Sequence, residues 1–279
     1  MPQKNGTRRD RSLIPGTLSI RLFGRFRALW RGREVALESR SARALLALVV
    51  LRPRPWIRDA ITAEIWPDAG YGSSARLRQA LWLVRKGLSR AGVNPAEILD
   101  IDNDTVGLRF GIGVDVDVVR FEEFVRRRPP ALEAALQLYE GEFAETLGLE
   151  CLASRREYLA DLYEDALASV AQTRLASGNL DGARVVATTL LDRDPLREEA
   201  HAVLIEVYGR GGSRSQVHRQ YRRLRSLLAR ELNAVPLPET NVSYMVALAR
   251  TAARSAGLAS EASGGNAPAT TTSRSVGVS

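Results

Sequence analysis

The chain is poor in the residues that most often carry covalent or metal chemistry. It has one cysteine, Cys151, and two histidines, His201 and His218, among 279 residues. A single cysteine excludes an internal disulfide, and the chain is therefore expected in a reducing compartment such as the cytoplasm. The signatures HExxH, GxSxG and GxxxxGK[ST] are all missing. We therefore expect no catalytic site, no metal site and no cofactor.

Long apolar runs are missing as well. The longest, Ala44 to Leu51, is far shorter than the roughly 20 residues of a membrane span. The first residues, MPQKNGTRRDRS, carry charges without a following apolar segment, so we expect no signal peptide and no membrane contact. A hydrophobic share of 45% is nevertheless sufficient for packed cores, and 279 residues suit about two domains.

Charge is distributed unevenly along the chain. Residues 1–115 hold 20 Lys/Arg and 11 Asp/Glu, a net charge of +9, whereas residues 116–279 hold 20 and 21, a net charge of −1. Only Lys4 and Lys86 are lysines, and all other basic residues are arginines. A basic half joined to a near-neutral half indicates that the first half meets a polyanion.

The segment SARLRQALWLVRKGL, Ser74 to Leu88, predicts one amphipathic helix. Leucines and a valine recur at steps of four, three and four, which is one stripe of a helix with 3.6 residues per turn. The stripe consists of Leu77, Leu81, Val84 and Leu88, with Gln79, Trp82 and Lys86 opposite and Arg76, Arg78, Arg85 and Arg90 along the sides. Such a face suits the DNA major groove, because Arg and Lys neutralise phosphates or bind guanine and Gln can pair with adenine. A solvated basic helix is the alternative.

The surrounding elements predict a winged helix-turn-helix over residues 17–115. Short strands precede a helix over residues 39–51, for which Ser41 is a plausible N-cap. A second short helix over residues 58–66 precedes the basic helix, and Ile61, Trp66 and Leu77 are expected in the core. Two strands around Asp102-Asn103-Asp104 would form the wing, from which Arg109 could contact a phosphate or remain a solvated strand residue.

From Val118 onward the pattern predicts helices throughout, so that residues 116–250 form an all-α domain. Gly178, Ala183 and Pro195 fit positions of a 34-residue tetratricopeptide repeat. A shift of 34 residues reaches Val217, but Ala229 stands where the second proline is required, so the spacing favours helical hairpins more than this repeat in particular. Residues 1–16 and 251–279 are polar or of low complexity and are expected to be disordered.

Several segments in this order resemble the SARP family of actinobacterial antibiotic-pathway regulators. They are LFGRFRALWRGREVALESRSARALLALVVL, AITAEIWPD, SSARLRQALWLVRKGL, ALQLYEGEF and YRRLRSLLARELNAVPLPE, and the resemblance covers about residues 17–250. The family joins an OmpR-type winged helix to a bacterial transcriptional activator domain made of tetratricopeptide-like helices. The resemblance implies an α+β winged helix-turn-helix followed by an all-α helical domain. It also implies binding of double-stranded DNA at direct repeats near promoters and recruitment of RNA polymerase holoenzyme.

By position, the resemblance implies a DNA-facing set on the basic helix and a phosphate contact at the start of the first helix. Ser41 and Arg43 would hold the phosphate through a hydroxyl, a guanidinium and the helix N-terminus, although Arg43 could also be a solvated charge. Arg85 could instead form an ion pair inside the domain. Trp82 departs from the family pattern and could contact thymine methyls, a partner or the wing. The implied set on the basic helix is Arg76, Arg78, Gln79, Trp82, Arg85 and Lys86.

Taken together, we interpret the chain as a sequence-specific DNA-binding transcriptional regulator without enzymatic activity. We expect an activator of a secondary-metabolite gene cluster that is cytoplasmic and nucleoid-associated, with a homodimer on DNA. The alternatives are a repressor on the same fold, a helical-repeat scaffold that binds other proteins, and a metabolite sensor whose helical groove binds a small molecule, although no set of residues in the sequence points to a ligand. The charge confined to residues 1–115 argues against the scaffold.

Overall fold

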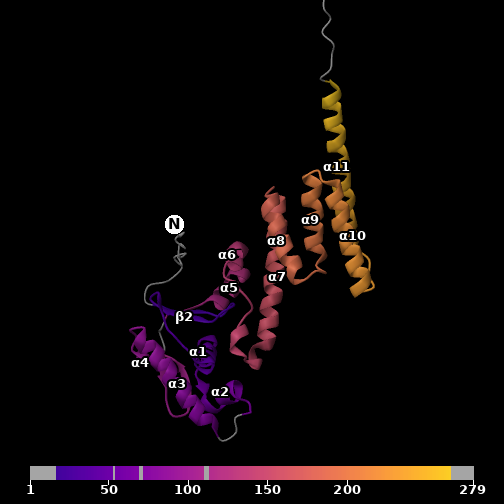
Figure 1. Ribbon diagram of the computed structural model, residues 1–279. Helices are drawn as coiled ribbons and strands as arrows, with labels where there is room; N and C mark the ends of the chain where they lie inside the picture. Colours follow the sequence, from indigo (N-terminus) through magenta and orange to yellow (C-terminus); the bar gives the residue numbers. More distant parts are fainter. Residues whose placement is uncertain (1–16, 53, 69–71, 110–112, 265–279) are drawn as a thin grey trace, which may run out of the picture. The chain divides into compact units, whose positions relative to one another are not determined.

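The computed structural model describes residues 17–52, 54–68, 72–109 and 113–264 (Figure 1). The chain divides into two compact units, Met1–Ala166 and Leu167–Ser279, which are described separately below. The segments 1–16 and 265–279, both expected to be disordered, lie outside the described residues.

The first unit opens with a four-stranded sheet. Its strands are β1 (Leu18–Arg21), β2 (Arg27–Trp30), β3 (Arg33–Glu34) and β7 (Val114–Val116), in the order β3-β2-β1-β7. β1 is antiparallel to β2 and parallel to β7. Arg31 and Gly32 both have positive φ, as a two-residue hairpin between β2 and β3 requires. β7 was not expected, because it joins the sheet from a distant part of the chain.

Three helices and a second sheet complete the winged helix-turn-helix. The helices are α1 (Arg40–Leu51), α2 (Arg58–Ile65) and α3 (Ser73–Arg90), close to the predicted ranges. A one-turn helix, α4 (Pro95–Ile98), leads into the hairpin of β5 (Leu99–Ile101) and β6 (Thr105–Leu108). The short β4 (Trp56–Ile57) pairs with β6 and gives the sheet order β4-β6-β5. The predicted wing is therefore present and is anchored by a third strand.

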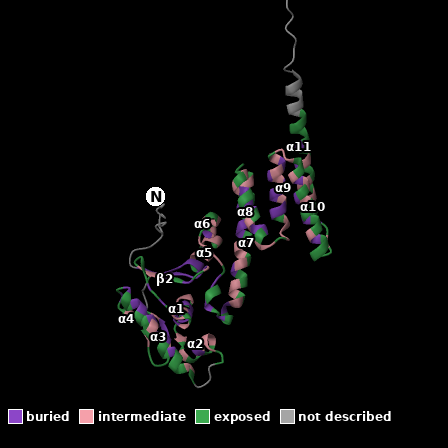
Figure 2. Ribbon diagram, viewed as in Figure 1, coloured by how far each residue is buried: buried purple, intermediate pink, exposed green. Residues whose placement is uncertain are grey.

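The predicted apolar stripe of α3 forms part of the core (Figure 2). Ile61 of α2 is also fully buried, whereas Trp66 is half-buried against the cluster. Gly87 lies where α3 meets the segment after β3, and a Cβ built on it would lie 2.7 Å from Leu37 Cδ2. A glycine at this position therefore lets α3 approach that segment closely. The buried stripe is Leu77, Leu81, Val84 and Leu88.

The first unit extends beyond the predicted domain boundary at residues 115/116, which falls inside β7. Asp117 begins α5 (Asp117–Arg126), and its buried carboxylate accepts hydrogen bonds from the backbone N–H groups of Leu22 and Phe23 at 2.9–3.0 Å. Burial raises the pKa of this carboxyl, and the backbone donors act against the rise. This contact fixes the end of β1 against the start of α5, so residues on both sides of residue 115 build one core.

An aromatic cluster strengthens the same connection. The Phe23 ring lies 5.3 Å from the ring of Phe121 and 6.5 Å from that of Phe143, centroid to centroid. The prediction of helices throughout from Val118 is wrong in this part, because after α5 and the short α6 (Leu132–Leu136) the chain is mostly irregular up to residue 152. Only two 3-10 turns, Glu145–Leu147 and Glu150–Leu152, interrupt that stretch. The irregular stretch brings Phe143 beside Phe23, with which it forms an isolated antiparallel β-bridge.

The second unit is a set of packed helices. The C-terminal part of α7 (Ala153–Ala176) is followed by α8 (Leu180–Arg193), α9 (Glu198–Arg210), α10 (Arg214–Glu231) and α11 (Pro238–Gly264). Gly178 and Gly212 occupy the turns before α8 and α10 with positive φ. Helical hairpins are thus present where the spacing favoured them. The specific assignment as tetratricopeptide repeats stays a prediction.

The expectation of disorder from residue 251 is wrong for residues 251–264, which continue α11. Thr251 is buried and its hydroxyl donates to the carbonyl of Leu248 at 2.8 Å. Arg254 donates to the carbonyl of Arg210 at 3.1 Å. Alanine favours helix strongly, so an Ala-rich segment that continues an anchored helix remains helical even though its composition is simple.

Candidate nucleic-acid interface

The candidate interface is the exposed face of α3, the second helix of the helix-turn-helix. Because the apolar stripe of α3 is buried, the residues on the opposite side and along both flanks face solvent. All seven predicted residues on this helix are exposed: Arg76, Arg78, Gln79, Trp82, Arg85, Lys86 and Arg90. The structure thus brings them together on one surface, with five positive charges and one amide around an indole.

Trp82 stands at the centre of this face with 56% of its surface exposed. The ammonium of Lys86, one turn later, lies 4.5 Å from the centroid of the indole ring. A cation over an exposed aromatic face contributes about 0.5–1 kcal/mol. Lys86 therefore lies against an indole that is more than half exposed to solvent.

The alternative for Arg85, an ion pair inside the domain, is not found. Arg85 is exposed and forms no ion pair within the described part of the chain. Its guanidinium remains available to a phosphate on the outer surface of α3.

The start of α1 differs from the expected phosphate site. The N-cap residue is Ser39 rather than Ser41, which lies half-buried in the first turn. Arg40 donates to the carbonyl oxygens of Leu147 and Gly148 at 2.8 and 3.1 Å. Arg43 is half-buried and donates to the carbonyl of Leu37 at 3.3 Å. The arginines at this helix end are thus engaged inside the unit, and Arg43 is a weaker candidate than the resemblance implies.

The wing places Arg109 away from its tip. Leu99 pairs with Leu108, so Arg109 lies at the base of the β5–β6 hairpin, where its N–H donates to the carbonyl of Ile98 at 2.9 Å. The tip is the turn at residues 102–104, in which the Asp102 carboxylate accepts from the N–H groups of Asp104 and Thr105. These bonds, that of Thr105 foremost, lower the pKa of Asp102. The tip therefore carries the Asp102 carboxylate, whereas Arg109 lies at the base of the wing.

The sequence reasoning missed one single arginine and one group of arginines. Arg58, at the start of α2, donates to the carbonyl of Asp102 at 2.8 Å and lines a polar cleft with Ser74 and Arg78. In the second unit, α10 has a row of exposed arginines although the unit lies in the near-neutral half. The net charge summed over residues 116–279 is close to zero and conceals the basic character of α10. Counting charges over a shorter window of sequence would have revealed it. The row is Arg214, Arg219, Arg222, Arg223, Arg225 and Arg230.

We also searched the described residues for a metal site, a membrane-spanning helix and a reactive cysteine. Within the described ranges no group of three His, Cys, Asp or Glu side chains could hold a metal ion. No helix of that part of the chain is both long and apolar enough to cross a membrane. Burial and the nearby Glu64 carboxylate raise the pKa of the Cys151 thiol to about 11, so this cysteine is not activated as a nucleophile.

The first unit is a winged helix in which α3 has a basic outer face, and a helical unit follows it. These features define the class of DNA-binding transcriptional regulators. Residues 116–246 match the bacterial transcriptional activator domain. With that match and the relatives below, the chain is similar to transcriptional regulators of the SARP family, and it carries the bacterial transcriptional activator domain.

Two relatives are the transcriptional regulatory proteins MoaR1 of Mycobacterium tuberculosis (strain ATCC 25618 / H37Rv) and of Mycobacterium bovis (strain BCG / Pasteur 1173P2). Each is 26% identical over 247 residues, which cover 82% of this chain and 78% of the relative. A solved structure of Mycobacterium tuberculosis EmbR in complex with a low affinity phosphopeptide has a TM-score of 0.66 and 23% identity, and covers 87% of this chain and 71% of that one. The likeness to EmbR establishes the shared fold.

Proposed function

We propose that the chain binds promoter DNA by placing the outer face of α3 in the major groove. The observation that carries this proposal is the division of α3 into a fully buried apolar stripe and an exposed basic face around Trp82. Gln79, Trp82 and Lys86 lie along the centre of that face, where base edges would be contacted. Arg76, Arg78, Arg85 and Arg90 would hold the flanking phosphates, and Arg109 would add a phosphate contact at the base of the wing.

The charge of the first half supplies affinity that does not depend on sequence. A net charge of +9 over residues 1–115 attracts the phosphate backbone. Each neutralised phosphate releases condensed counterions, so the logarithm of the affinity falls with the logarithm of salt concentration with a slope of roughly −0.9 per phosphate bound. We expect the N-terminal part of the chain to account for this slope and the second unit to contribute little.

The resemblance to the SARP family supports a proposal for the finer partners. The chain would activate transcription by contact with RNA polymerase holoenzyme, as a homodimer on direct repeats near the promoter of a secondary-metabolite gene cluster. It would be found in the cytoplasm with the nucleoid. A repressor on the same fold would bind DNA through the same face, and only transcription measured with purified polymerase separates the two.

The test uses the full chain and a fluorescent duplex that contains a binding site selected from random sequence. Arg78→Ala/Arg85→Ala should reduce both the affinity and the salt slope, the slope by about 0.9 for each phosphate that is no longer neutralised. The matched control is Arg219→Ala/Arg222→Ala, which removes two exposed arginines from α10, a helix of the same length. A salt-independent affinity, or an equal reduction in the control, would contradict the proposal.

The scaffold function is the second candidate, and one observation favours it. The second unit has an apolar groove of about 600 Å³ among α7, α9 and α11. The two functions are compatible, because the groove residues belong to the second unit whereas α3 belongs to the first.

A further inference from the structure

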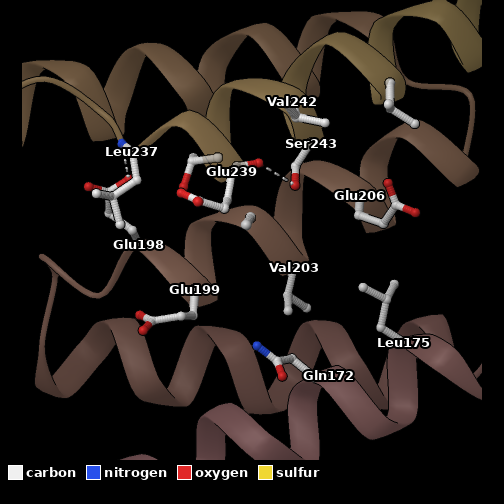
Figure 3. A pocket seen from close by; sticks show the side chains of 13 residues that line it. Gln172, Leu175, Glu198, Glu199, Val203, Glu206, Leu237, Glu239, Val242 and Ser243 are labelled. Atoms are coloured by element: carbon white, nitrogen blue, oxygen red, sulfur yellow. Dashed lines mark hydrogen bonds between the residues drawn. The ribbon is translucent and has the colours of Figure 1, made fainter.

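The groove of the second unit combines exposed apolar side chains with carboxylates. Val203 of α9, Val242 of α11 and Leu175 of α7 line its apolar part (Figure 3). A volume of about 600 Å³ lies within the range of roughly 300–1,000 Å³ that is typical of built binding sites. Leu237 is 54% exposed and Val242 61%, which is unusual for aliphatic side chains that line one concave surface.

The carboxylates at the two ends of the groove differ in whether arginines neutralise them. Glu206 accepts from Arg210 at 3.1 Å and is also paired with Arg250, so its charge is compensated. At the other end, Glu199 and Glu239 are exposed and form no ion pair within the described residues. Glu198 lies beside them and accepts the N–H of Leu237 at 2.9 Å (Figure 3). One end of the groove is therefore acidic and uncompensated, whereas the other is neutralised.

We infer that this groove binds a cationic amphipathic helix of a partner protein. Apolar side chains of such a helix, spaced at i, i+3, i+4 and i+7, would fill the space between α9 and α11. Its arginines or lysines would lie at the end that holds Glu198, Glu199 and Glu239. Glu198 and Glu206 lie eight residues apart on α9, a rise of about 12 Å, so the groove accommodates about two turns of helix.

Charge complementarity selects this occupant. An acidic helix would bring like charges to the uncompensated end, and a fully apolar helix would leave three carboxylates facing a surface that cannot solvate them. The inference does not depend on the proposed DNA contact, because the groove residues belong to the second unit and α3 to the first.

The test uses the full chain and a fluorescent synthetic helix with leucines at i, i+3, i+4 and i+7 and arginines at one end, measured by anisotropy. Two altered peptides serve as comparisons, one with glutamate for arginine and one with serine for leucine. The leucine–arginine peptide should bind at least about tenfold more tightly than either. Equal binding of all three peptides, or no binding of the first, overturns the inference.

Matched protein variants locate the site. Val242→Asp places a charge in the groove and should weaken peptide binding by at least about tenfold. Val185→Asp is the control, because Val185 is a comparably exposed valine, at 55%, on α8 outside the groove lining. If Val242→Asp unfolds the unit, Glu199→Gln/Glu239→Gln remains informative, because it changes only exposed carboxylates and should still weaken binding. Equal binding by the groove variants and the control overturns the inference, and DNA binding measured on the same variants reports separately on α3.

Discussion

Replacing Trp82 by alanine tests whether α3 is oriented as described. Trp82 is 56% exposed, so much of it lies outside the core, and the Lys86 ammonium lies 4.5 Å from the centroid of its indole ring. Truncating a fully buried tryptophan costs about 3–5 kcal/mol, whereas removing an exposed cation–π pair costs about 0.5–1 kcal/mol. We therefore expect Trp82→Ala to lower the free energy of unfolding by about 1 kcal/mol or less. In a domain of this size that decrease shifts the melting temperature by roughly 2–4 °C.

The effect of Trp82→Ala on DNA binding should be much larger than its effect on stability. A side chain that contacts a base edge contributes about 1–3 kcal/mol to discrimination, which corresponds to roughly a 5- to 150-fold loss of specific affinity. Binding to unrelated duplex should change little, because phosphate contacts from the arginines remain. The assay is fluorescence anisotropy with a selected and an unrelated duplex, together with calorimetric melting of the same preparations.

The matched control is the preceding residue, Leu81, which is 3% exposed and belongs to the buried apolar stripe of α3. Leu81→Ala should lower stability by about 2–5 kcal/mol through a core cavity. A large fall in melting temperature for Trp82→Ala, comparable to that of Leu81→Ala, would refute the assigned orientation of α3. Unchanged specific binding at unchanged stability would refute the role of Trp82 at the interface.

Three further predictions concern single residues. Gln79→Ala should leave the free energy of unfolding within about 0.5 kcal/mol, yet reduce discrimination at one base pair by about 1–3 kcal/mol, as measured by binding to duplexes mutated one position at a time; uniform weakening on every duplex would contradict a base contact. Gly87→Ala should destabilise the first unit by about 1–3 kcal/mol in chemical denaturation although alanine favours helix, because the new Cβ would meet Leu37 Cδ2 at 2.7 Å and the Ala36 carbonyl oxygen at 2.9 Å; a more stable variant would show that the contact relaxes. His201 is buried with its ring nitrogens bonded to the Pro195 carbonyl and the Gln220 amide, and burial lowers its pKa, so the unfolded chain takes up a proton first as pH falls below about 6.5. The contribution of His201 to the free energy of unfolding of the second unit should therefore be fully present above that pH and decline towards pH 5. Urea titrations of His201→Gln should lack this part of the decline. An identical decline in the variant would assign it to other groups.

The winged helix could be predicted because its signals are local. The stripe of Leu77, Leu81, Val84 and Leu88 encodes both the existence of α3 and the side that faces the core, since helical periodicity is complete within two turns. Burial of that stripe leaves Gln79 and the arginines on the opposite side, so the sequence also indicated which residues face outward. Turn residues such as Gly32 marked the hairpin by the same short-range logic.

Long-range contacts decided what the sequence could not. The Asp117 carboxylate accepts a hydrogen bond from the N–H of Leu22, 95 residues earlier in the sequence. No local sequence pattern predicts that β7 pairs with β1. The engagement of Arg43 by the Leu37 carbonyl likewise depends on how the chain turns before α1. A periodicity constrains neighbours along the chain, whereas these contacts depend on which segments meet in space.

Charge illustrates the same division. The sequence by itself determined a basic first half, the amphipathic face of α3 and the helical character of the second half. Only the tertiary structure brought Glu239 of α11 together with Glu198 and Glu199 of α9 at one groove, because these residues are distant in the sequence. A net charge is a sum over all residues regardless of their position, whereas a binding partner interacts only with the charges on the surface that it contacts. Which surface each charge occupies is decided by the packing of helices, and it was therefore fixed by the fold.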